Sequence, residues 1–230
     1  MISIIIPTYN HGPVIGDCLD SILRQSEKDW EVIVVNDGST DQTEEILKHY
    51  QDKFPANRFS FFSKPNEGSN PSRNFGAVRA KGDFLLFSDD DLVMKEDMLA
   101  LMKQTLNENP QSAFVYCSYK YGPKLFRLFP YSEERLRRMP YIHSTSLIRK
   151  EAFPGFDNNI KRLQDWDVWL TMLENGHRGI WIDQVLFEVK TGGHISSWVP
   201  KAFYKLFPFL PTVKKYKQAE AIIKAKHNLS

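Results

Sequence analysis

Three short runs of apolar residues, each followed by a polar turn, constrain the fold of this chain more than any other feature. They are ISIII at 2–6, EVIVV at 31–35 and FLLF at 84–87. Nearly continuous apolar runs of this length are typical of strands that a parallel sheet buries on both faces. A fourth strand is expected at 59–62, and helical patterns separate these strands. Strands that alternate with helices form right-handed βαβ units, so we predict an α/β fold with a mostly parallel central sheet flanked by helices.

The second half of the chain continues the alternation, with one irregular stretch. We expect a helix at 98–106, strands at 113–118, 141–148 and 179–189, and a helix that starts near 163. Residues 119–140 are polar, aromatic and basic without clear periodicity. We interpret them as a loop-rich insertion that covers the substrate.

Length and charge exclude several classes of protein. The 230 residues fit one large domain with a short appendage, and a net charge of +2 is too small to indicate a nucleic-acid partner. The chain opens on a strand pattern, shows no signal peptide and has no apolar run of about 20 residues. We therefore expect a cytoplasmic protein, either free or peripheral at the inner face of the membrane.

Polar turns follow three of the predicted strands, so topology brings them to one edge of the sheet. They are residues 7–10, residues 36–41 and the acidic run at 89–91. Open α/β sheets bind their ligands at this edge. Three adjacent carboxylates repel one another and are costly to bury, and oxygen ligands favour Mg²⁺ or Mn²⁺. The alternative is a solvated acidic turn.

The order and spacing of five local motifs resemble the family 2 glycosyltransferases of the GT-A fold, which invert at the anomeric carbon. The motifs are PTYN at 7–10, NDGSTD at 36–41, NEGSNPSRNFG at 66–76, DDD at 89–91 and QDW at 164–166. The resemblance covers roughly residues 2–197, and it implies a GT-A catalytic domain at 1–197 followed by a basic, aromatic C-terminal extension at 198–230. A nucleotide-diphospho-sugar transferase fold with a C-terminal helical extension is therefore expected.

The resemblance implies a set of nucleotide-sugar-binding residues. Pro7, Thr8 and Tyr9 would line the base pocket, and Asp37 would accept a hydrogen bond from a uracil-like imide N–H. Arg73 would reach the diphosphate. The alternatives are an Asx-turn role for Asp37 and a surface salt bridge for Arg73.

The acidic run matches the Asp-x-Asp motif of the family. By this likeness Asp91 would ligate Mn²⁺ or Mg²⁺, Asp89 would contact the ribose or a metal-bound water, and Asp90 fills the variable position. Such an ion stabilises the departing nucleoside diphosphate as a Lewis acid. His194, in a glycine-rich loop, is a further candidate ligand of the metal or the diphosphate.

The catalytic base is expected at the start of the helix near 163. The family has a Glu-Asp pair there and this chain has Gln164 and Asp165, so Asp165 is the predicted base that takes the proton of the acceptor hydroxyl. Asp167 is the second choice. The alternative for Asp165 is a helix cap.

The C-terminal extension mixes basic and aromatic residues. Its lysines include Lys201, Lys205, Lys214, Lys215 and Lys217. This composition suits peripheral contact with an anionic leaflet, and the alternatives are packing on the catalytic domain or pairing across a homodimer.

These motifs predict a metal-dependent, inverting glycosyltransferase that acts in polysaccharide or glycolipid synthesis. The donor would be a nucleoside diphosphate sugar, with UDP expected, and the acceptor a hydroxyl of a saccharide or a lipid-linked molecule. One alternative is a metal-dependent phosphotransferase, but that class needs its key Asp after the first strand, where Pro7 and Thr8 stand. The other is a non-catalytic nucleotide-sugar or membrane-surface binding module with a decayed GT-A site.

Overall fold

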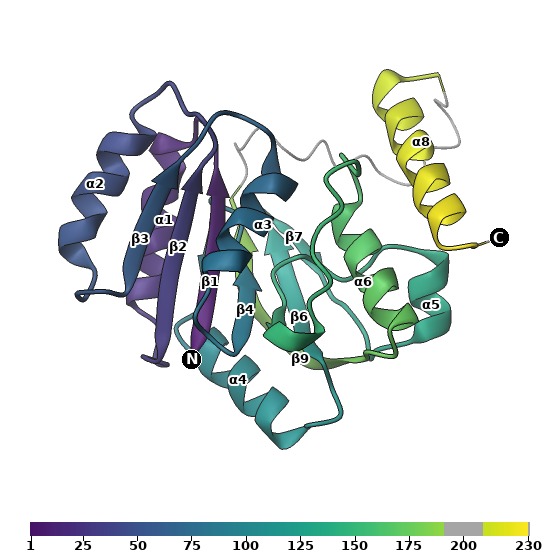
Figure 1. The fold of residues 1–230 in the computed structure, drawn as a ribbon. Helices are drawn as coiled ribbons and strands as arrows, with labels where there is room; N and C mark the ends of the chain where they lie inside the picture. Colours follow the sequence, from purple (N-terminus) through teal and green to yellow (C-terminus); the bar gives the residue numbers. More distant parts are fainter. Residues whose placement is uncertain (191–208, 230) are drawn as a thin grey trace.

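The computed structural model describes residues 1–190 and 209–229 as an α/β fold with one large central sheet (Figure 1). The strands are β1 (Ile2–Thr8), β2 (Trp30–Asn36), β3 (Phe59–Ser63), β4 (Phe84–Phe87), β5 (Leu92–Met94), β6 (Phe114–Tyr121), β7 (Lys124–Phe126), β8 (Leu147–Arg149) and β9 (Gly179–Val189). The helices are α1 (Gly12–Leu23), α2 (Thr43–Lys53), α3 (Ser69–Arg79), α4 (Met98–Glu108), α5 (Glu133–Arg138), α6 (Gln164–Glu174) and α8 (Pro211–Lys226), with a 3-10 turn at Lys150–Ala152.

The first half of the sheet is parallel, as the alternating pattern predicts. Strands β3, β2, β1 and β4 lie side by side in that order and run in the same direction. Successive side chains of a strand point to opposite faces, so Ile4 joins the core under α1 while Ile5 joins the core on the α3 side. Helices cover both faces, which explains why these strands are apolar at almost every position.

The second half of the sheet is mixed. Strand β8 runs antiparallel to both of its neighbours, β4 and β6, and β9 runs parallel to β6 and antiparallel to β5. The sheet order places three strands, β8, β6 and β9, between β4 and β5, yet only residues 88–91 separate β5 from β4 along the chain. Because so short a link spans at most about 18 Å, the sheet curls and brings the two strands close.

The structure corrects two predictions about the middle of the chain. Residues 119–140 are more regular than expected: β6 continues to Tyr121, turns at Gly122 with φ +51° and pairs with β7, and α5 follows. Most of the strand expected at 141–148 does not form, because β8 starts only at Leu147. The segment before it turns instead, with Ser146 Oγ donating to the His143 carbonyl at 2.7 Å.

Helix α8 lies beside α6, although the two are far apart in the sequence (Figure 1). Its Val213 and Ile223 are fully buried, and Lys226 at its end pairs with Asp167 of α6 at 2.8 Å. The described residues of the extension therefore pack on the body of the protein. No helix among 1–190 and 209–229 combines the length and the apolar character needed to span a bilayer.

Candidate active site

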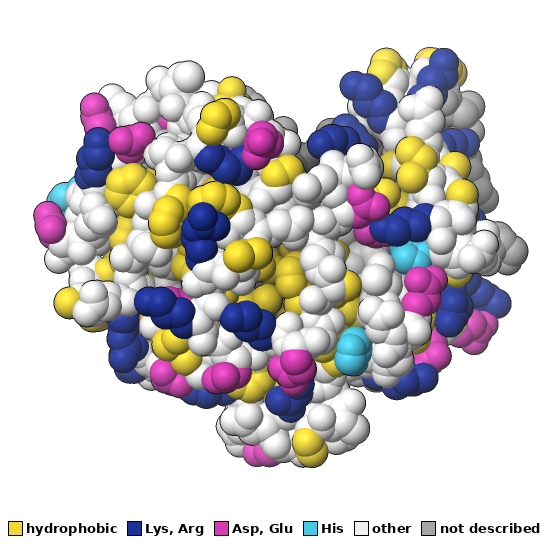
Figure 2. All heavy atoms as spheres, in the orientation of Figure 1, with side chains coloured by type: hydrophobic (Ala, Val, Ile, Leu, Met, Phe, Trp, Pro, Cys, Tyr) yellow, Lys and Arg dark blue, Asp and Glu magenta, His cyan; other side chains and the backbone are white. Residues whose placement is uncertain are grey.

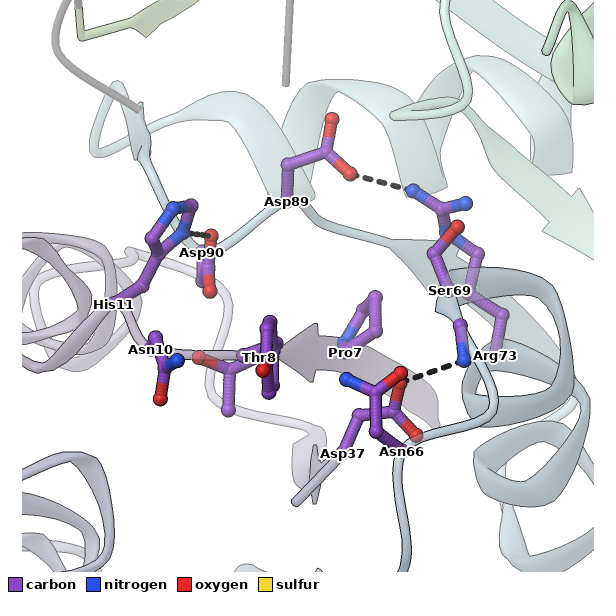
Figure 3. A pocket seen from close by; sticks show the side chains of 12 residues that line it. Pro7, Thr8, Asn10, His11, Asp37, Asn66, Ser69, Arg73, Asp89 and Asp90 are labelled. Carbon is purple, nitrogen blue, oxygen red and sulfur yellow. Dashed lines mark hydrogen bonds and ion pairs between the residues drawn. The ribbon is translucent and has the colours of Figure 1, made fainter. Parts of the chain in front are cut away.

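A cavity of about 530 Å³ opens at the carboxyl edge of the parallel strands (Figure 3). The first-strand turn, the second-strand turn, the amino end of α3 and the acidic run after β4 meet there. Its lining residues are Pro7, Thr8, Tyr9, Asn10, His11, Asp37, Asn66, Gly68, Ser69, Arg73, Asp89 and Asp90. All seven residues predicted to bind the nucleotide sugar are in this lining. The prediction that the three turns meet at one edge of the sheet is confirmed, and the roles of the residues remain predictions.

The two strand turns hold each other in place. The Asp37 amide donates to the Thr8 carbonyl at 2.9 Å, and the Thr40 amide donates to Asn10 Oδ1 at 2.7 Å. Asn10 has φ +53°, a left-handed conformation that asparagine tolerates better than most residues. Tyr9, in the same turn, is 46% exposed and lines the cavity, so its ring offers a flat face for stacking.

Asp37 is almost fully buried and its carboxylate already has three donors. It accepts from Lys64 Nζ at 2.5 Å, from the Glu67 amide at 3.1 Å and from the Gly68 amide at 2.8 Å. Burial works to raise the pKa of Asp37, but these hydrogen bonds outweigh it and lower the pKa. Asp37 is therefore ionised and fastens the loop before α3 to the second-strand turn.

The buried Arg73 and the half-buried Asp89 form an ion pair in the lining of the cavity. Arg73 Nη2 donates to Asp89 Oδ1 at 2.7 Å (Figure 3). Burial works to raise the pKa of Asp89, but the charge and the hydrogen bond of Arg73, together with weaker effects of neighbouring groups, outweigh it and lower the pKa. The Nε and Nη1 atoms of Arg73 and the hydroxyl of Thr8 are buried with no hydrogen-bond partner among the described residues. Buried donors without a hydrogen-bond partner cost free energy, so the cavity favours a ligand that offers several hydrogen-bond acceptors.

His11 is a site residue that the sequence analysis missed. Its Nδ1 lies 2.7 Å from Asp90 Oδ1, both side chains are buried, and this hydrogen bond raises the pKa of His11. Asp90 is thus tied to the turn after β1. The partners are 79 residues apart along the chain, so no local pattern could have indicated the pair.

Asp91 differs from the other two carboxylates of the acidic run. In the part of the chain that the structure describes, no side chain forms an ion pair with it, and it does not line the cavity. Burial and the charges of Asp89 and Asp90 raise the pKa of Asp91 to about 7. A bound cation would relieve this repulsion, and oxygen is the ligand that Mg²⁺ and Mn²⁺ prefer.

No group of three or more metal-ligating side chains occurs within residues 1–190 and 209–229. This is compatible with a Mg²⁺-type site, because such ions usually bind through one or two carboxylates together with substrate phosphates. The predicted ligand His194 and the predicted boundary between 197 and 198 lie outside the described residues.

Asp165 lies in the first turn of α6, near enough to His143 and Arg73 for their charges to act on it. Its only hydrogen bond among the described residues is from the Trp166 amide, at 2.9 Å. Burial raises the pKa of Asp165, and the charges of Arg73 and Asp89 also act on it. Asp165 is half-buried and does not line the cavity, so it stands next to the cavity residues rather than among them.

His143 lies near Asp89 and Asp165, and it is a second residue that the sequence did not indicate. Its Nε2 is 3.8 Å from Asp89 Oδ2, and the charge of Asp165 also acts on it. Burial lowers the pKa of His143, so the ring is neutral at neutral pH. Because Nδ1 accepts from the Thr145 amide at 3.0 Å, the proton is on Nε2, which faces Asp89.

Comparison with known proteins agrees with this architecture. The family model described as glycosyl transferase family 2 matches residues 3–162. An uncharacterized glycosyltransferase of Rickettsia typhi is 32% identical over 191 residues, which are 75% of this chain and 58% of that protein. The putative teichuronic acid biosynthesis glycosyltransferase TuaG of Bacillus subtilis is 29% identical over 201 residues, which are 83% of this chain and 79% of that protein.

Two solved structures share the fold. Staphylococcus aureus TarS in complex with UDP-GlcNAc aligns with a TM-score of 0.74 at 24% identity, covering 89% of this chain and 64% of that one. The mannosyltransferase PcManGT of Pyrobaculum calidifontis, in complex with GDP-Man and Mn²⁺, aligns with a TM-score of 0.70 at 21% identity, covering 96% and 69%. The match spans 58% of the length of the Rickettsia typhi relative and 57% of the length of a relative from Rickettsia prowazekii. With the family model matching more than half of the chain, and with a GT-A fold, this protein belongs to glycosyl transferase family 2.

Proposed function

We propose that this chain transfers a sugar from a nucleoside diphosphate donor to an acceptor hydroxyl, with inversion at the anomeric carbon. UDP is the nucleotide that we expect, and residues 1–197 are the proposed catalytic domain. TarS binds UDP-GlcNAc and PcManGT binds GDP-Man, which supports a nucleotide sugar as donor. TuaG, a putative teichuronic acid enzyme, supports a role in cell-envelope polysaccharide synthesis.

The observation that carries the proposal is the set of unsatisfied donors in the cavity. Arg73 has two buried N–H groups and Thr8 one buried hydroxyl without partners among the described residues, and all three belong to cavity-lining side chains. A diphosphate offers charged acceptors with the geometry that an arginine fork prefers. The exposed Tyr9 ring suits a nucleobase, whose flat face it can stack against.

Asp37 has a structural role in addition to the expected contact with the nucleobase. Three donors occupy most of its acceptor sites, and Lys64 balances its charge. We therefore assign Asp37 first to holding the 64–68 loop against the second-strand turn. The contact of Asp37 with the base imide remains part of the proposal as a second role.

The residues present fit a divalent cation next to the diphosphate. Asp91 would be the protein ligand, and Asp89, although paired with Arg73, has its second oxygen on the same side as His143. The ion would supply Lewis-acid stabilisation of the leaving diphosphate. Arg73 shares that task from the protein side, since its charge acts at the same acidic run.

Asp165 is the proposed base. A carboxylate with a raised pKa accepts a proton more readily than an ordinary aspartate, and the other groups near Asp165 leave its carboxylate bonded to one amide only. The neutral His143 orients its Nε2 proton toward Asp89 and adds no positive charge beside the base. The acceptor hydroxyl would therefore be deprotonated from the α6 side of the site.

A panel of nucleotide sugars tests this function directly. The full chain is titrated with UDP- and GDP-sugars with and without Mn²⁺, and slow release of the nucleoside diphosphate is followed. Metal-dependent binding with hydrolysis supports the proposal. Absence of binding to every nucleoside diphosphate sugar would contradict it.

A second candidate is a binding module without transferase activity. Gln164 stands where the family has an acidic residue, which supports this candidate. Donor binding that needs Mn²⁺, with no hydrolysis and no transfer to any saccharide or lipid-linked acceptor, would favour it.

A further inference from the structure

A second cleft of about 300 Å³ lies between α8 and the loop that precedes α6, and it shares no lining residue with the donor cavity. Residues 159–162 form one wall and one face of α8 forms the other. The lining residues are Asn159, Ile160, Lys161, Arg162, Lys215, Gln218, Ala219 and Ile222. Figure 2 shows Lys and Arg side chains gathered on and beside α8, next to the hollow that separates this helix from the rest of the face.

One side of helix α8 packs on the protein, and a second side lines the cleft. Val213 and Ile223 are buried against the protein. Lys215, Gln218, Ala219 and Ile222 follow the spacing i, i+3, i+4, i+7, so they share a separate stripe that lines the cleft. This second stripe is open, since Ile222 is 58% exposed.

The cleft concentrates positive charge. None of the described residues that line it is acidic, and Lys161, Arg162 and Lys215 form no ion pair within the described residues. In contrast, the lysines at the end of α8 are neutralised: Lys226 pairs with Asp157 and Asp167, and Lys224 with Glu220. Three uncompensated cations on two facing walls attract an anion.

The cleft is also partly apolar. Ile160, Ala219 and Ile222 contribute hydrocarbon surface to its walls, and Phe209, just before α8, is 64% exposed. A free phosphate would use the cations alone and would leave this apolar surface in water. A molecule with an anionic head and an alkyl chain uses both kinds of surface.

We propose that this cleft docks the phosphate headgroup and the first methylenes of an anionic lipid, and so seats the protein on an anionic membrane surface. The composition of the C-terminal extension predicts peripheral contact with an anionic leaflet without saying where it occurs. The cleft assigns this contact to Lys161, Arg162 and Lys215. Each Lys or Arg near an anionic leaflet strengthens binding by about fivefold.

Asn70 links the wall of the docking cleft to the wall of the donor cavity. Asn70 of α3 donates through Nδ2 to the Ile160 carbonyl and to the Asp157 carbonyl, both at 2.8 Å, and its neighbours Ser69 and Arg73 line the donor cavity. Arg162 comes three residues before Asp165 in the sequence. A lipid held in the cleft would bring the membrane surface to the acceptor side of the site, a consequence that rests on the proposed function, whereas docking itself does not.

Co-sedimentation of the full chain with vesicles tests the docking cleft. The vesicles contain equal parts of phosphatidylcholine and phosphatidylglycerol, and phosphatidylcholine alone is the neutral comparison. We expect binding to the anionic vesicles only. Lys215→Glu and the double variant Lys161→Glu/Arg162→Glu should each weaken partitioning by about tenfold or more, because each replaced cation becomes a repelling anion.

Lys217→Glu is the matched control, because it makes the same charge change on the same helix. Lys217 is exposed and lies two residues from Lys215, so the two side chains point to roughly opposite sides of α8. Its effect should stay below about threefold. UDP binding, measured on every variant, reports that the fold and the donor cavity are intact and does not depend on lipid.

Three outcomes would overturn the lipid-docking cleft. Equal losses for Lys215→Glu and Lys217→Glu would mean diffuse electrostatic adsorption. Equal binding to neutral vesicles would mean that apolar contact through Phe209 and Ile222 is sufficient. Binding of inorganic phosphate at the cleft without vesicle binding would mean that it holds a free anion.

Discussion

Asp165 and Asp167 lie two residues apart in the first turn of α6 and have opposite surroundings. Asp167 is fully buried and pairs with Lys226 at 2.8 Å and with His227 Nε2 at 2.9 Å, whereas Asp165 accepts one hydrogen bond, from the Trp166 amide. Residues at this spacing point to roughly opposite sides of a helix. Asp167 is therefore committed to holding the C-terminal segment, and the structure removes it as the second choice for the base.

We expect Asp165→Asn to end transfer and to leave donor binding intact. Loss of a general base lowers the rate by about 10²–10⁴-fold, while the affinity for UDP should change by less than about threefold. Steady-state kinetics and calorimetric titration measure the two quantities. A parallel loss of UDP affinity would mean that Asp165 supports the fold of the site.

Asp167→Asn serves as the contrasting variant. It breaks a buried ion network, which costs about 3 kcal/mol of unfolding free energy. Urea unfolding should reveal this loss, and the Asp165→Asn protein should unfold near the wild-type midpoint. A loss of stability in Asp165→Asn but not in Asp167→Asn would mean that Asp165 is the structural residue, contrary to our assignment.

Arg73→Lys tests the diphosphate contact. Lysine keeps the positive charge next to Asp89 but loses the planar fork with its Nε and Nη1 donors, so UDP binding should weaken by about tenfold. Arg79→Lys on the same helix is the control. Arg79 stacks on the Phe75 ring, 3.4 Å from its centroid, and lies outside the cavity. Equal effects of the two substitutions on UDP affinity would contradict the assignment.

Asp91→Asn should abolish the part of donor binding that depends on Mn²⁺. Removal of the one carboxylate that would ligate the ion is expected to reduce the metal-dependent gain in UDP affinity by about tenfold or more. Asp90→Asn is the comparison, since Asp90 is engaged with His11. UDP titrations at several Mn²⁺ concentrations separate the two variants, and a metal response retained by Asp91→Asn would exclude Asp91 as the ligand.

The contact between α8 and α6 should weaken as the pH rises. Burial works to lower the pKa of His227, but its hydrogen bonds to Asp167 and Glu174 outweigh it and raise the pKa. A group with a raised folded-state pKa contributes stability that is complete below its unfolded value of about 6.5 and is lost as the pH passes the folded-state value. The stability difference between wild type and His227→Gln should therefore shrink with rising pH.

Urea unfolding of both proteins across the neutral range measures this difference. The acids that face His227 are the buried Asp167 and the exposed Glu174, both on α6. A difference that is constant with pH would mean that the ring is bound in its neutral form in the folded protein.

The sequence by itself determined the parallel half of the sheet and the meeting of three loops at its edge. Strands such as 2–6 and 84–87 are apolar at nearly every position, so they had to be buried on both faces, and parallel strands carry their following turns to one edge. Those are consequences of local pattern and chain direction. They do not depend on which side chains form ion pairs or hydrogen bonds within the site.

Only the tertiary structure decided which carboxylates form ion pairs within the protein and which are left to bind a ligand. Asp89, Asp90 and Asp91 are identical in type and adjacent in sequence, yet Arg73 pairs with the first and His11 with the second. The partner of Asp167 is 60 residues away, in the C-terminal segment. The state of a buried charge depends on the groups that folding brings within a few ångströms of it, and that distance is not written in the spacing of the residues along the chain.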